Sequence, residues 1–461
     1  MTETTDARLT RARAGRATAP VAVAHLGLGA FFRAHQAVYT DLAPDAEAWG
    51  IAAFTGRSPT LAEQLTAQDG LYTLLEQGPS GDTCSVISSV SRAHPGADLG
   101  DWTWTLADAA TAVLTITVTE AAYLRTESGA LRLDDPAVQS DLASLKGGRL
   151  TEVATVPGRL VAGLAARHAE DGTPIAVVPC DNLLQNGAAV RRIVLDLADE
   201  LDNGVADWIR DQVSFVSSAV DRITPRTTDR DRDTVLNATG LADVCPVVAE
   251  PFSEWVIAGE FPAGRPGWEH AGALLVDDVT PYEQRKLWLL NGAHSLLAYA
   301  GSIRGHRTVA DAMADETCSR WVEEWWAEAA PHLDLSDETV RAYCADLRTR
   351  FANPRIHHLL EQIAMDGSQK LPVRVLPVVR AERAAGRIPT AASRTLAAWV
   401  LHLRGAGAPV DDPGADELVA GAAGPLPDAV RRTLDTLDPA LGSDTALTDA
   451  VATCAEELSR P

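Results

Sequence analysis

The chain has 461 residues, which at roughly 150 residues per domain predicts two or three domains. Hydrophobic residues make up 46% of the chain and charged residues 22%, values that exclude wholesale disorder and a fibrous repeat. The formal net charge of -23 repels phosphate backbones and anionic membrane surfaces, so nucleic acids and membranes are not expected partners.

The first twenty residues are polar, and no apolar segment follows their arginines as it would in a secretory leader. We expect residues 1–20 to form a flexible arm. No stretch approaches the roughly 18 consecutive apolar residues of a transmembrane helix. The six cysteines lie far apart without a CxxC pair, which fits a reducing compartment and predicts a cytoplasmic protein without a structural zinc site.

Residues 21–280 alternate short apolar runs with helical stretches. Several of these runs are almost continuously apolar and β-branched, which is typical of parallel strands covered on both faces. The pattern predicts the α/β fold class, with an N-terminal Rossmann-type doubly wound domain that binds a dinucleotide. We expect strands at 21–26, 51–54, 86–90, 112–118, 175–178 and 213–220.

Residues 281–461 differ in pattern from residues 21–280, because helical patterns follow one another and no strong strand pattern interrupts them. We expect a mostly α-helical C-terminal domain that binds the substrate, with the boundary at the turn 277–281. The stretch 405–415, rich in Gly, Pro and Asp, is expected to be a loop. The expected helices are 281–304, 308–330, 336–351, 354–365, 391–404, 416–423, 427–436 and 445–458.

A glycine-containing turn follows the first expected strand and reads His25-Leu-Gly-Leu-Gly-Ala-Phe-Phe-Arg33. Glycines in such a turn let backbone amides approach a pyrophosphate at the positive end of a helix. Phe32 occupies the position of the third glycine, so the GxGxxG fingerprint is incomplete, and a tight turn without a nucleotide is the alternative. The candidate cofactor-binding residues here are Gly27, Leu28, Gly29, Ala30 and Phe31.

The end of the second expected strand reads Thr55-Gly56-Arg57-Ser58 and lacks the acidic residue that binds the adenosine ribose of NAD. Arg57 can instead bind the 2′-phosphate of NADP, which places it among the candidate cofactor-binding residues. A surface arginine in an arginine-rich chain is the alternative. The sequence therefore predicts NAD or NADP as the cofactor without choosing between them.

Two further strand ends carry polar side chains to the edge of the sheet where ligands of doubly wound folds bind. Glu120 follows the strand expected at 112–118, and Asn182 follows the strand expected at 175–178. Both are candidate pocket residues. The alternatives are a helix N-terminal acid stabilised by the helix dipole for Glu120, and a turn-forming residue for Asn182.

The helix expected at 281–304 carries Glu283, Lys286, Asn291 and His294 within an arc of roughly 140°, at about 100° per residue. Apolar leucines share this arc, which is the environment that lets a lysine act as a base near neutral pH. Only three of the forty basic residues are lysines, and an arginine cannot serve as such a base. The alternative is a set of solvated or core-satisfied side chains.

The segment 364–374 contains an Asp-Gly-Ser turn. We expect it to present Lys370 and Arg374 from a loop, where the two cations can bind a carboxylate, a phosphate or several hydroxyl groups. A turn between helices with exposed bases is the alternative.

These motifs together resemble the polyol-specific long-chain dehydrogenases, commonly called the mannitol dehydrogenase family. The resemblance follows the chain in order and covers most of it. The combination of KxxxxNxxH with the upstream CDN is its most specific part. The matching stretches are HLGLGAFFRAHQAVYTD (25–41), AQDGLYTL (67–74), TVTEAAY (117–123), CDN (180–182), VDRITPRTT (220–228), KLWLLNGAH (286–294) and AMDGSQKLPVR (364–374).

The resemblance implies zinc-independent hydride transfer between a nicotinamide cofactor and a sugar carbonyl or secondary alcohol. Lys286 then matches the family's general base, and Asn182 and Asn291 match the pair that holds the reacting oxygen. His294 matches a histidine that orients the substrate. Two amide groups can stabilise an alkoxide as its charge develops, a task otherwise given to a metal.

The remaining site residues and the substrate are also implied by the resemblance. Glu120 and Glu283 are expected to pass the proton to solvent, and Asp221, Lys370 and Arg374 to bind the substrate. The form DGSQKLPxR resembles fructuronate reductases, also called mannonate oxidoreductases, and the two cations suit a uronate carboxylate. We expect fructuronate and mannonate as substrates, with mannitol 2-dehydrogenase, arabinitol dehydrogenase and mannitol-1-phosphate 5-dehydrogenase activities as alternatives.

Two other classes of function stay open at this stage. A catalytically silent nucleotide-binding sensor would keep the fold and lose the reaction, and the intact catalytic set argues against it. A zinc-dependent dehydrogenase needs clustered Cys, His or Glu ligands, which the sequence does not show. The expected partner is therefore a small sugar, polyol or sugar acid, and the oligomeric state is left open, a monomer included.

Overall fold

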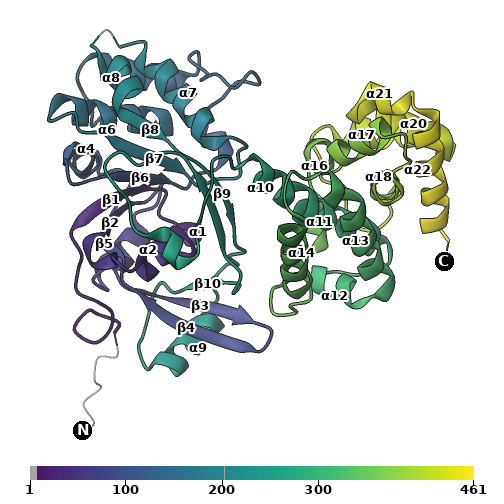
Figure 1. Cartoon of the computed structure of the whole chain (residues 1–461), viewed down its shortest axis with the longest axis horizontal. Helices are drawn as coiled ribbons and strands as arrows, with labels where there is room; N and C mark the ends of the chain where they lie inside the picture. The colour runs from purple at the N-terminus through teal and green to yellow at the C-terminus, as the bar shows by residue number, and fades with distance from the viewer. Residues whose placement is uncertain (1–7, 202, 461) are drawn as a thin grey trace. The chain divides into compact units, whose positions relative to one another are not determined.

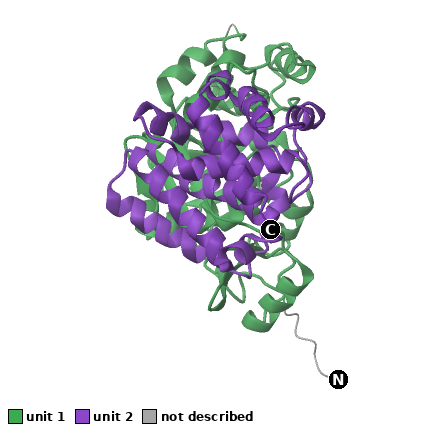
Figure 2. Ribbon diagram, turned by 90° about the vertical axis from the view of Figure 1, so that its right-hand side faces the viewer, with its two compact units in different colours: residues 1–280 green, residues 281–461 purple. Residues whose placement is uncertain are grey.

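The computed structural model describes residues 8–201 and 203–460. The chain forms two compact units, residues 1–280 and residues 281–461, which Figure 2 shows in green and purple. Unit 1 contains strands and helices, whereas unit 2 is built from helices. This organisation confirms the predicted fold class, a Rossmann-type α/β domain followed by a mostly α-helical domain.

Within the described residues, the centre of unit 1 is a parallel six-stranded sheet with the order β5-β2-β1-β6-β7-β8 (Figure 1). The chain direction across the sheet reverses between β1 and β6, which makes this the switch point where doubly wound folds bind their ligands. The strands are β1 (Val21–Leu26), β2 (Gly50–Phe54), β5 (Val90–His94), β6 (Val113–Ile116), β7 (Ile175–Pro179) and β8 (Val213–Phe215).

Neighbouring residues of each strand pack into two different cores, one on each face of the sheet. In β1, Val23 faces one core and Ala24 the other, and Ala176 and Val177 of β7 divide in the same way. Because side chains alternate along a strand, one uninterrupted apolar run fills both cores. Helices α4 (Leu99–Ala107), α5 (Pro136–Lys146), α6 (Val156–Ala169), α7 (Asn186–Ala198) and α8 (Val205–Gln212) line one core, and α1 (Ala30–Ala34), α2 (Gln36–Leu42) and α3 (Thr60–Thr66) line the other.

Two small sheets that the sequence analysis did not predict add to unit 1. In one, β3 (Tyr72–Gly78) pairs antiparallel with β4 (Gly81–Ile87) and parallel with β10 (Val247–Ala249). Helix α9 (Asp229–Thr239) packs against β3 and β4 (Figure 1). In the other, β11 (Glu254–Ala258) pairs antiparallel with β9 (Ser217–Asp221) and parallel with β12 (Leu274–Leu275).

Two of the predicted strands are wrong, because in each case one apolar run crosses from one sheet into another. The run 86–90 contains the end of β4 and the start of β5, and the run 213–220 contains β8 and β9. Val216, at the second break, is fully buried, so the hydrophobic pattern carries no sign of the bend. The other four predicted strands are confirmed, with ends that differ by at most two residues.

Part of the predicted flexible arm is anchored to unit 1. Residues 1–7 lie outside the described residues. In residues 8–20, Leu9 is fully buried, and the Arg11 guanidinium donates to the carbonyls of Ser88 and Val90 at 2.9 Å each. The prediction of a flexible arm is therefore wrong for residues 8–20, because an arginine that looks solvated in the sequence binds backbone acceptors beside the outermost strand, β5.

Unit 2 is organised around α18 (Thr390–Leu403), a helix that is buried along almost its whole length. A helix that is apolar on all sides takes the centre of a bundle. Helices α11, α13, α17, α20 and α22 and the π-helix η5 pack against it. The helices of unit 2 are α10 (Thr280–Arg285), α11 (Ala293–Leu296), α12 (Val309–Ala314), α13 (Glu316–Ala329), α14 (Asp337–Phe351), α15 (Leu360–Ala364), α16 (Gly367–Arg374), α17 (Leu376–Ala384), α19 (Ala415–Gly421), α20 (Leu426–Leu437), α21 (Pro439–Gly442) and α22 (Thr445–Leu458), with the π-helices η4 (Lys286–Gly292) and η5 (Leu297–Gly301).

Several predicted helices differ from the structure. The helix expected at 308–330 is divided into α12 and α13 at Asp315, whose carboxylate accepts the amide of Thr317 and so begins a new helix. Of the helix expected at 354–365, only α15 is helical. Conversely, α16 and α17 were not predicted. Among the described residues, no helix combines the length and the apolar character needed to cross a membrane.

The turn after β1 leaves no room for a side chain. Gly27 has φ +106°, and a Cβ atom at this position would lie 1.9 Å from the carbonyl oxygen of Thr117. Thr117 directly follows β6, so the glycine lets the first turn pass against the end of the neighbouring strand. The close contact between the turn after β1 and the end of β6 at the switch point therefore depends on a glycine at position 27.

We expect Gly27→Ala to lower the free energy of unfolding by at least about 2 kcal/mol, because the new Cβ meets a backbone oxygen in a strained conformation. Gly56→Ala is the matched control: this glycine lies in the turn after β2, and a Cβ there meets nothing within 4 Å. Urea unfolding followed by circular dichroism measures both variants. Equal midpoints for Gly27→Ala and Gly56→Ala would contradict the close approach.

Candidate active site

The predicted site residues fall into two groups, one in each compact unit. Unit 1 carries Gly27, Leu28, Gly29, Ala30, Phe31, Arg57, Glu120, Asn182 and Asp221, and unit 2 carries Glu283, Lys286, Asn291, His294, Lys370 and Arg374.

The turn after β1 offers backbone amides at the start of α1. The amides of Gly27 and Leu28 both donate to the carbonyl of Phe54, at 2.9 and 2.8 Å. The amides that remain for a ligand are those of Gly29 to Phe31, since the first turn of a helix has no intrahelical acceptors for them. Phe32, in place of a third glycine, is fully buried and stacks on His25 with ring centroids 3.6 Å apart.

A dinucleotide fits this turn. Because Gly27 has no Cβ, the turn can pass against the end of β6, and the amides at the start of α1 suit a pyrophosphate. The hydroxyl of Thr117, at the adjoining strand end, is buried and has no hydrogen-bond partner among the described residues. A buried hydroxyl without a partner is costly, so a polar ligand at this edge would stabilise it.

Arg57 is exposed in the bend that follows β2. Thr55, the first residue after β2, accepts the amide of Gly96 through its hydroxyl at 2.8 Å. No acidic side chain stands in this bend, as the sequence already indicated. The structure therefore leaves Arg57 available to a 2′-phosphate without selecting it.

Asn182 lies in a turn that its neighbour Asp181 holds in place. Asp181 accepts the hydroxyl of Tyr123 at 2.5 Å and the amide of Leu183 at 2.9 Å. Burial raises the pKa of the Asp181 carboxyl, and the nearby charge of Glu120 raises it further. Sequence analysis singled out only Asn182, although Tyr123 and Asp181 both lie in the matching stretches TVTEAAY and CDN.

Glu120 and Asp221 lie in different surroundings in unit 1. Glu120 is exposed and begins the 3-10 helix η2 (Glu120–Tyr123). Asp221 is buried and ends β9. The next residue, Arg222, is also buried and donates to the carbonyl of Glu250 and to the carboxylate of Glu76. Arg222 therefore fixes the segment that carries Asp221.

The segment with Lys286 and Asn291 is a π-helix, not the regular α-helix that sequence analysis assumed. The cause lies in α13, whose indole groups bind the backbone of this segment. Trp325 Nε1 donates to the carbonyl of Trp288 at 2.8 Å, and Trp326 Nε1 donates to the carbonyl of Leu289 at 2.9 Å. Side-chain donors inserted at the carbonyls of a helix open its i→i−4 ladder and favour a π-bulge.

The widened helix changes which side chains are neighbours. In a π-helix, residues five apart are joined by a hydrogen bond, so Lys286 and Asn291 lie one turn apart rather than at the edges of a broad arc. Both side chains are half-buried, whereas Glu283 is buried. Glu283, Lys286 and Asn291 thus lie on consecutive helical elements, α10 and η4, and the angular spacing of Lys286 and Asn291 is smaller than in a regular α-helix.

His294 follows on α11 and is buried among aromatic rings. Its imidazole stacks on Phe351 with centroids 4.6 Å apart and meets His358 edge-on at 4.9 Å. Burial lowers the pKa of His358, and the charge of Arg350 lowers it further, which favours the neutral form of the ring that meets His294. These contacts fix the orientation of the His294 ring.

The prediction that a loop carries Lys370 and Arg374 is wrong, because residues 367–374 form α16 with Pro372 inside it. Lys370 Nζ donates to the carbonyl of Met365 at 2.6 Å and lies 3.6 Å from the carboxylate of Asp366. Burial lowers the pKa of Lys370, and the nearby Arg374 lowers it further. Lys370 thus binds the backbone at the end of α15 and is half-buried, which differs from the exposed base of the alternative.

Arg374 points to the helix that carries His294. Its Nη1 lies 3.4 Å from the hydroxyl of Ser295, the residue after His294. Burial lowers the pKa of Arg374 to about 10. The nearby Tyr299 and Asp366 raise this pKa, but their effect is smaller than that of burial. Relative to the number of its N–H donors, Arg374 makes fewer described hydrogen bonds than Lys370, the other cation of α16.

Asp412, which positions α16, was not among the site residues predicted from the sequence. Its carboxylate accepts the amide of Ser368 at 2.8 Å and also the hydroxyl of Ser368. An acidic group at the first turn of a helix satisfies amides that the helix leaves open. Asp412 lies in the predicted loop 405–415, some forty residues from α16, and no local pattern connects the two.

Two groups of described side chains place possible metal ligands close together, although the sequence showed none. They are His306, Asp315 and Cys318, and His94, Asp98 and Asp101. The carboxylate of Asp315 already binds Arg304 at 2.6 Å, and Asp98 caps α4 by accepting the amide of Asp101. Because these carboxylates are engaged and neither group contains a candidate catalytic residue, we assign no metal to them.

Comparisons with known proteins place the whole chain among related dehydrogenases. The family model described as the mannitol dehydrogenase Rossmann domain matches residues 21–270, and the mannitol dehydrogenase C-terminal domain matches residues 278–457. The D-mannonate oxidoreductase of Escherichia coli (strain K12) is 36% identical over 402 residues, which cover 85% of this chain and 81% of that protein.

Two solved structures are also similar. A substrate-free D-sorbitol dehydrogenase aligns with a TM-score of 0.87 at 30% identity, over 95% of this chain and 93% of that one. The mannitol 2-dehydrogenase of Pseudomonas fluorescens, solved in a ternary complex with NAD and D-mannitol, aligns with a TM-score of 0.78 at 32% identity, over 98% and 94%.

We expect Gly292→Ala to destabilise unit 2 by about 1–3 kcal/mol, because a Cβ at this position would lie 2.5 Å from Cζ2 of Trp325. The displaced indole would also lose its hydrogen bond to the π-helical segment. Gly421→Ala is the matched control, since this helical glycine faces open space and the change there is expected to be neutral or stabilising. Thermal unfolding of the two variants tests the prediction, and a Gly292→Ala protein as stable as Gly421→Ala would refute it.

Proposed function

Because the chain belongs to the mannitol dehydrogenase family of NAD(P)-dependent polyol and sugar-acid oxidoreductases, we propose that it interconverts fructuronate and mannonate, with Lys286 as the general base and without a metal. The observation that carries the proposal is the π-helical segment, in which Lys286 and Asn291 lie one turn apart and His294 follows on the next helix. A lysine and an amide side by side are the groups that metal-free alcohol oxidation needs.

Unit 1 is proposed to hold the dinucleotide and unit 2 the sugar. The amides of Gly29, Ala30 and Phe31 would bind the pyrophosphate, while Gly27 and Leu28 shape the turn. Arg57 would bind a 2′-phosphate if the cofactor is NADP. When bound, the nicotinamide accepts a hydride in alcohol oxidation and supplies one in ketone reduction.

Side chains of this protein transfer the proton of the substrate hydroxyl group. The neutral amine of Lys286 takes the hydroxyl proton during oxidation, and its ammonium returns the proton during reduction. Asn182 and Asn291 donate hydrogen bonds to the oxygen as negative charge develops on it. His294, held by its stacked ring, orients a substrate hydroxyl. Glu120 and Glu283 are proposed to exchange the proton with solvent.

Arg374 favours a sugar acid as the substrate. Among the described residues its hydrogen bonding is limited to one long contact with Ser295, although a guanidinium carries five N–H donors. Burial penalises this cation, and the planar fork of a guanidinium matches a carboxylate in two parallel hydrogen bonds. A uronate carboxylate would therefore compensate its burial, and Asp221 would bind sugar hydroxyls.

A neutral polyol such as mannitol or arabinitol is the second candidate. The observation in its favour is that Lys370 already donates to the carbonyl of Met365, which leaves one cation of α16, not two, for an anionic substrate. A catalytically silent nucleotide-binding protein is the alternative of a different class. A panel of ketohexoses, pentuloses and hexuronates with NADH and NADPH separates the three.

We expect Lys286→Ala to lower kcat by at least about a hundredfold, because proton transfer is lost while the turn that binds the dinucleotide is untouched. The Kd for NADH or NADPH, measured by fluorescence titration, should stay near that of the unmodified protein. The control is Lys146→Ala, which removes an exposed lysine of unit 1 that pairs with Glu200 at 3.8 Å. A Lys286→Ala enzyme that keeps most of its activity would overturn the base assignment.

We expect Arg374→Gln to lower kcat/KM for fructuronate about tenfold to a hundredfold, with a much smaller loss for fructose. A charge-assisted hydrogen bond contributes about 1.5–3 kcal/mol, and only the acid loses it. Arg380→Gln is the control, because Arg380 is an exposed arginine of α17 that pairs with Asp438. Equal losses on both sugars would move the proposed substrate from the uronate to the polyol.

A further inference from the structure

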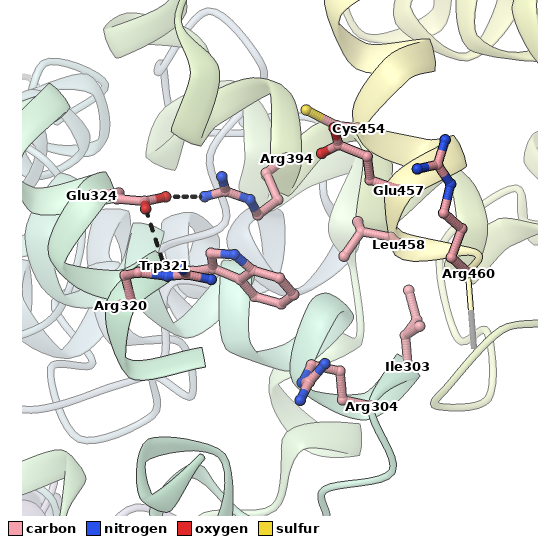
Figure 3. A pocket seen from close by; sticks show the side chains of 10 residues that line it. All are labelled: Ile303, Arg304, Arg320, Trp321, Glu324, Arg394, Cys454, Glu457, Leu458 and Arg460. Atoms are coloured by element: carbon pink, nitrogen blue, oxygen red, sulfur yellow. Dashed lines mark hydrogen bonds and ion pairs between the residues drawn. The ribbon is translucent and has the colours of Figure 1, made fainter. Parts of the chain in front are cut away.

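A polar cavity of about 580 Å³ lies wholly within unit 2 and is separate from the residues assigned to catalysis. It is lined by α13, α18 and the end of α22, and by Ile303 and Arg304, which follow η5 (Figure 3). A volume of a few hundred cubic ångströms is typical of small-molecule sites.

Arginines dominate this cavity, in a chain that carries far more acids than bases. Four of the forty basic residues line it, against two glutamates, whereas the whole chain has sixty-three acids. The local charge is thus opposite in sign to the net charge of -23. The four are Arg304, Arg320, Arg394 and Arg460.

Two of the guanidiniums are held in position before any ligand arrives. Arg394 donates to Glu324 at 2.7 Å, and Arg304 donates to Asp315 at 2.6 Å. Both also lie over the indole ring of Trp321, 5.2 and 5.7 Å from its centroid. Figure 3 shows Trp321 between them. The ring and the carboxylates reduce the entropy that these long side chains would lose on binding an anion.

Arg394 and Arg304 have further N–H groups that can donate hydrogen bonds to a ligand. Across the described residues, each donates from a single nitrogen, Nη1 for Arg394 and Nε for Arg304, out of five N–H groups. Arg460, two residues after the end of α22, is exposed and lies across the cavity from Arg394 in Figure 3. Leu458 and Ile303 add apolar surface beside these donors.

We propose that this cavity binds a phosphate group, carried by a phosphorylated sugar or present as free phosphate. A carboxylate is satisfied by one guanidinium fork, whereas a phosphate has three acceptor oxygens and up to two charges, which suits arginines that converge from several helices. The apolar surface of Trp321 and Leu458 would contact the carbon skeleton of a sugar phosphate.

Isothermal titration calorimetry in phosphate-free buffer tests whether the cavity binds a phosphate group, with fructose 6-phosphate and inorganic phosphate as separate probes. We expect saturable binding of at least one probe, weakened at least tenfold by Arg394→Gln and by Arg460→Gln. The latter changes an exposed side chain, so we expect the fold to stay intact. A stronger response to one probe identifies the source of the phosphate group.

Arg348→Gln is the matched control, because Arg348 pairs with Glu323 at 2.7 Å and lies 5.3 Å from the centroid of the Trp326 ring, yet does not line the cavity. Binding should be unchanged in this variant and in Arg374→Gln, which alters the proposed substrate site. No binding of either probe, or equal weakening by Arg348→Gln and Arg394→Gln, would overturn the proposal.

Discussion

Two indole hydrogen bonds, from Trp325 and Trp326 of α13 to the backbone of the segment Lys286–Gly292, are the constraint on which the candidate active site depends. They divert two carbonyls from the α-helical ladder and so widen the helix. The wider turn places Asn291 beside Lys286, and Gly292 lets the indole of Trp325 approach closely. Large buried tryptophans therefore act here as hydrogen-bond donors that set the spacing of polar groups on another helix.

The substrate side of unit 2 depends on a second long-range contact. Asp412 binds Ser368 at the first turn of α16, which fixes the helix that carries Lys370 and Arg374. The two cations of this helix then differ in their partners. Lys370 donates to the carbonyl of Met365. Arg374 lies beside the helix that carries His294, and most of its N–H groups have no described hydrogen bond. A charged ligand would be recognised mainly by the guanidinium, whose geometry is suited to paired oxygens.

The sequence predicted most of the elements but not their local distortions. The parallel strands were visible because runs such as Val21–Leu26 are apolar on both faces, and the site motifs were visible as polar residues that follow expected strands or share one face of an expected helix. The π-helix was not visible, since its cause lies in tryptophans more than thirty residues away, at 325 and 326. The Asp-Gly-Ser turn gave a local signal for a loop that tertiary contacts overrode to form α16.

The most direct test of the central claim, that the amine of Lys286 carries the proton, is the pH dependence of kcat/KM in both directions. Alcohol oxidation needs the neutral amine, so its rate should rise with pH to a plateau, and ketone reduction should show the mirror image around the same inflection. In the Lys286→Ala enzyme this inflection should vanish, leaving oxidation that rises with hydroxide alone. An unchanged inflection in that variant would show that another group carries the proton and would contradict the account.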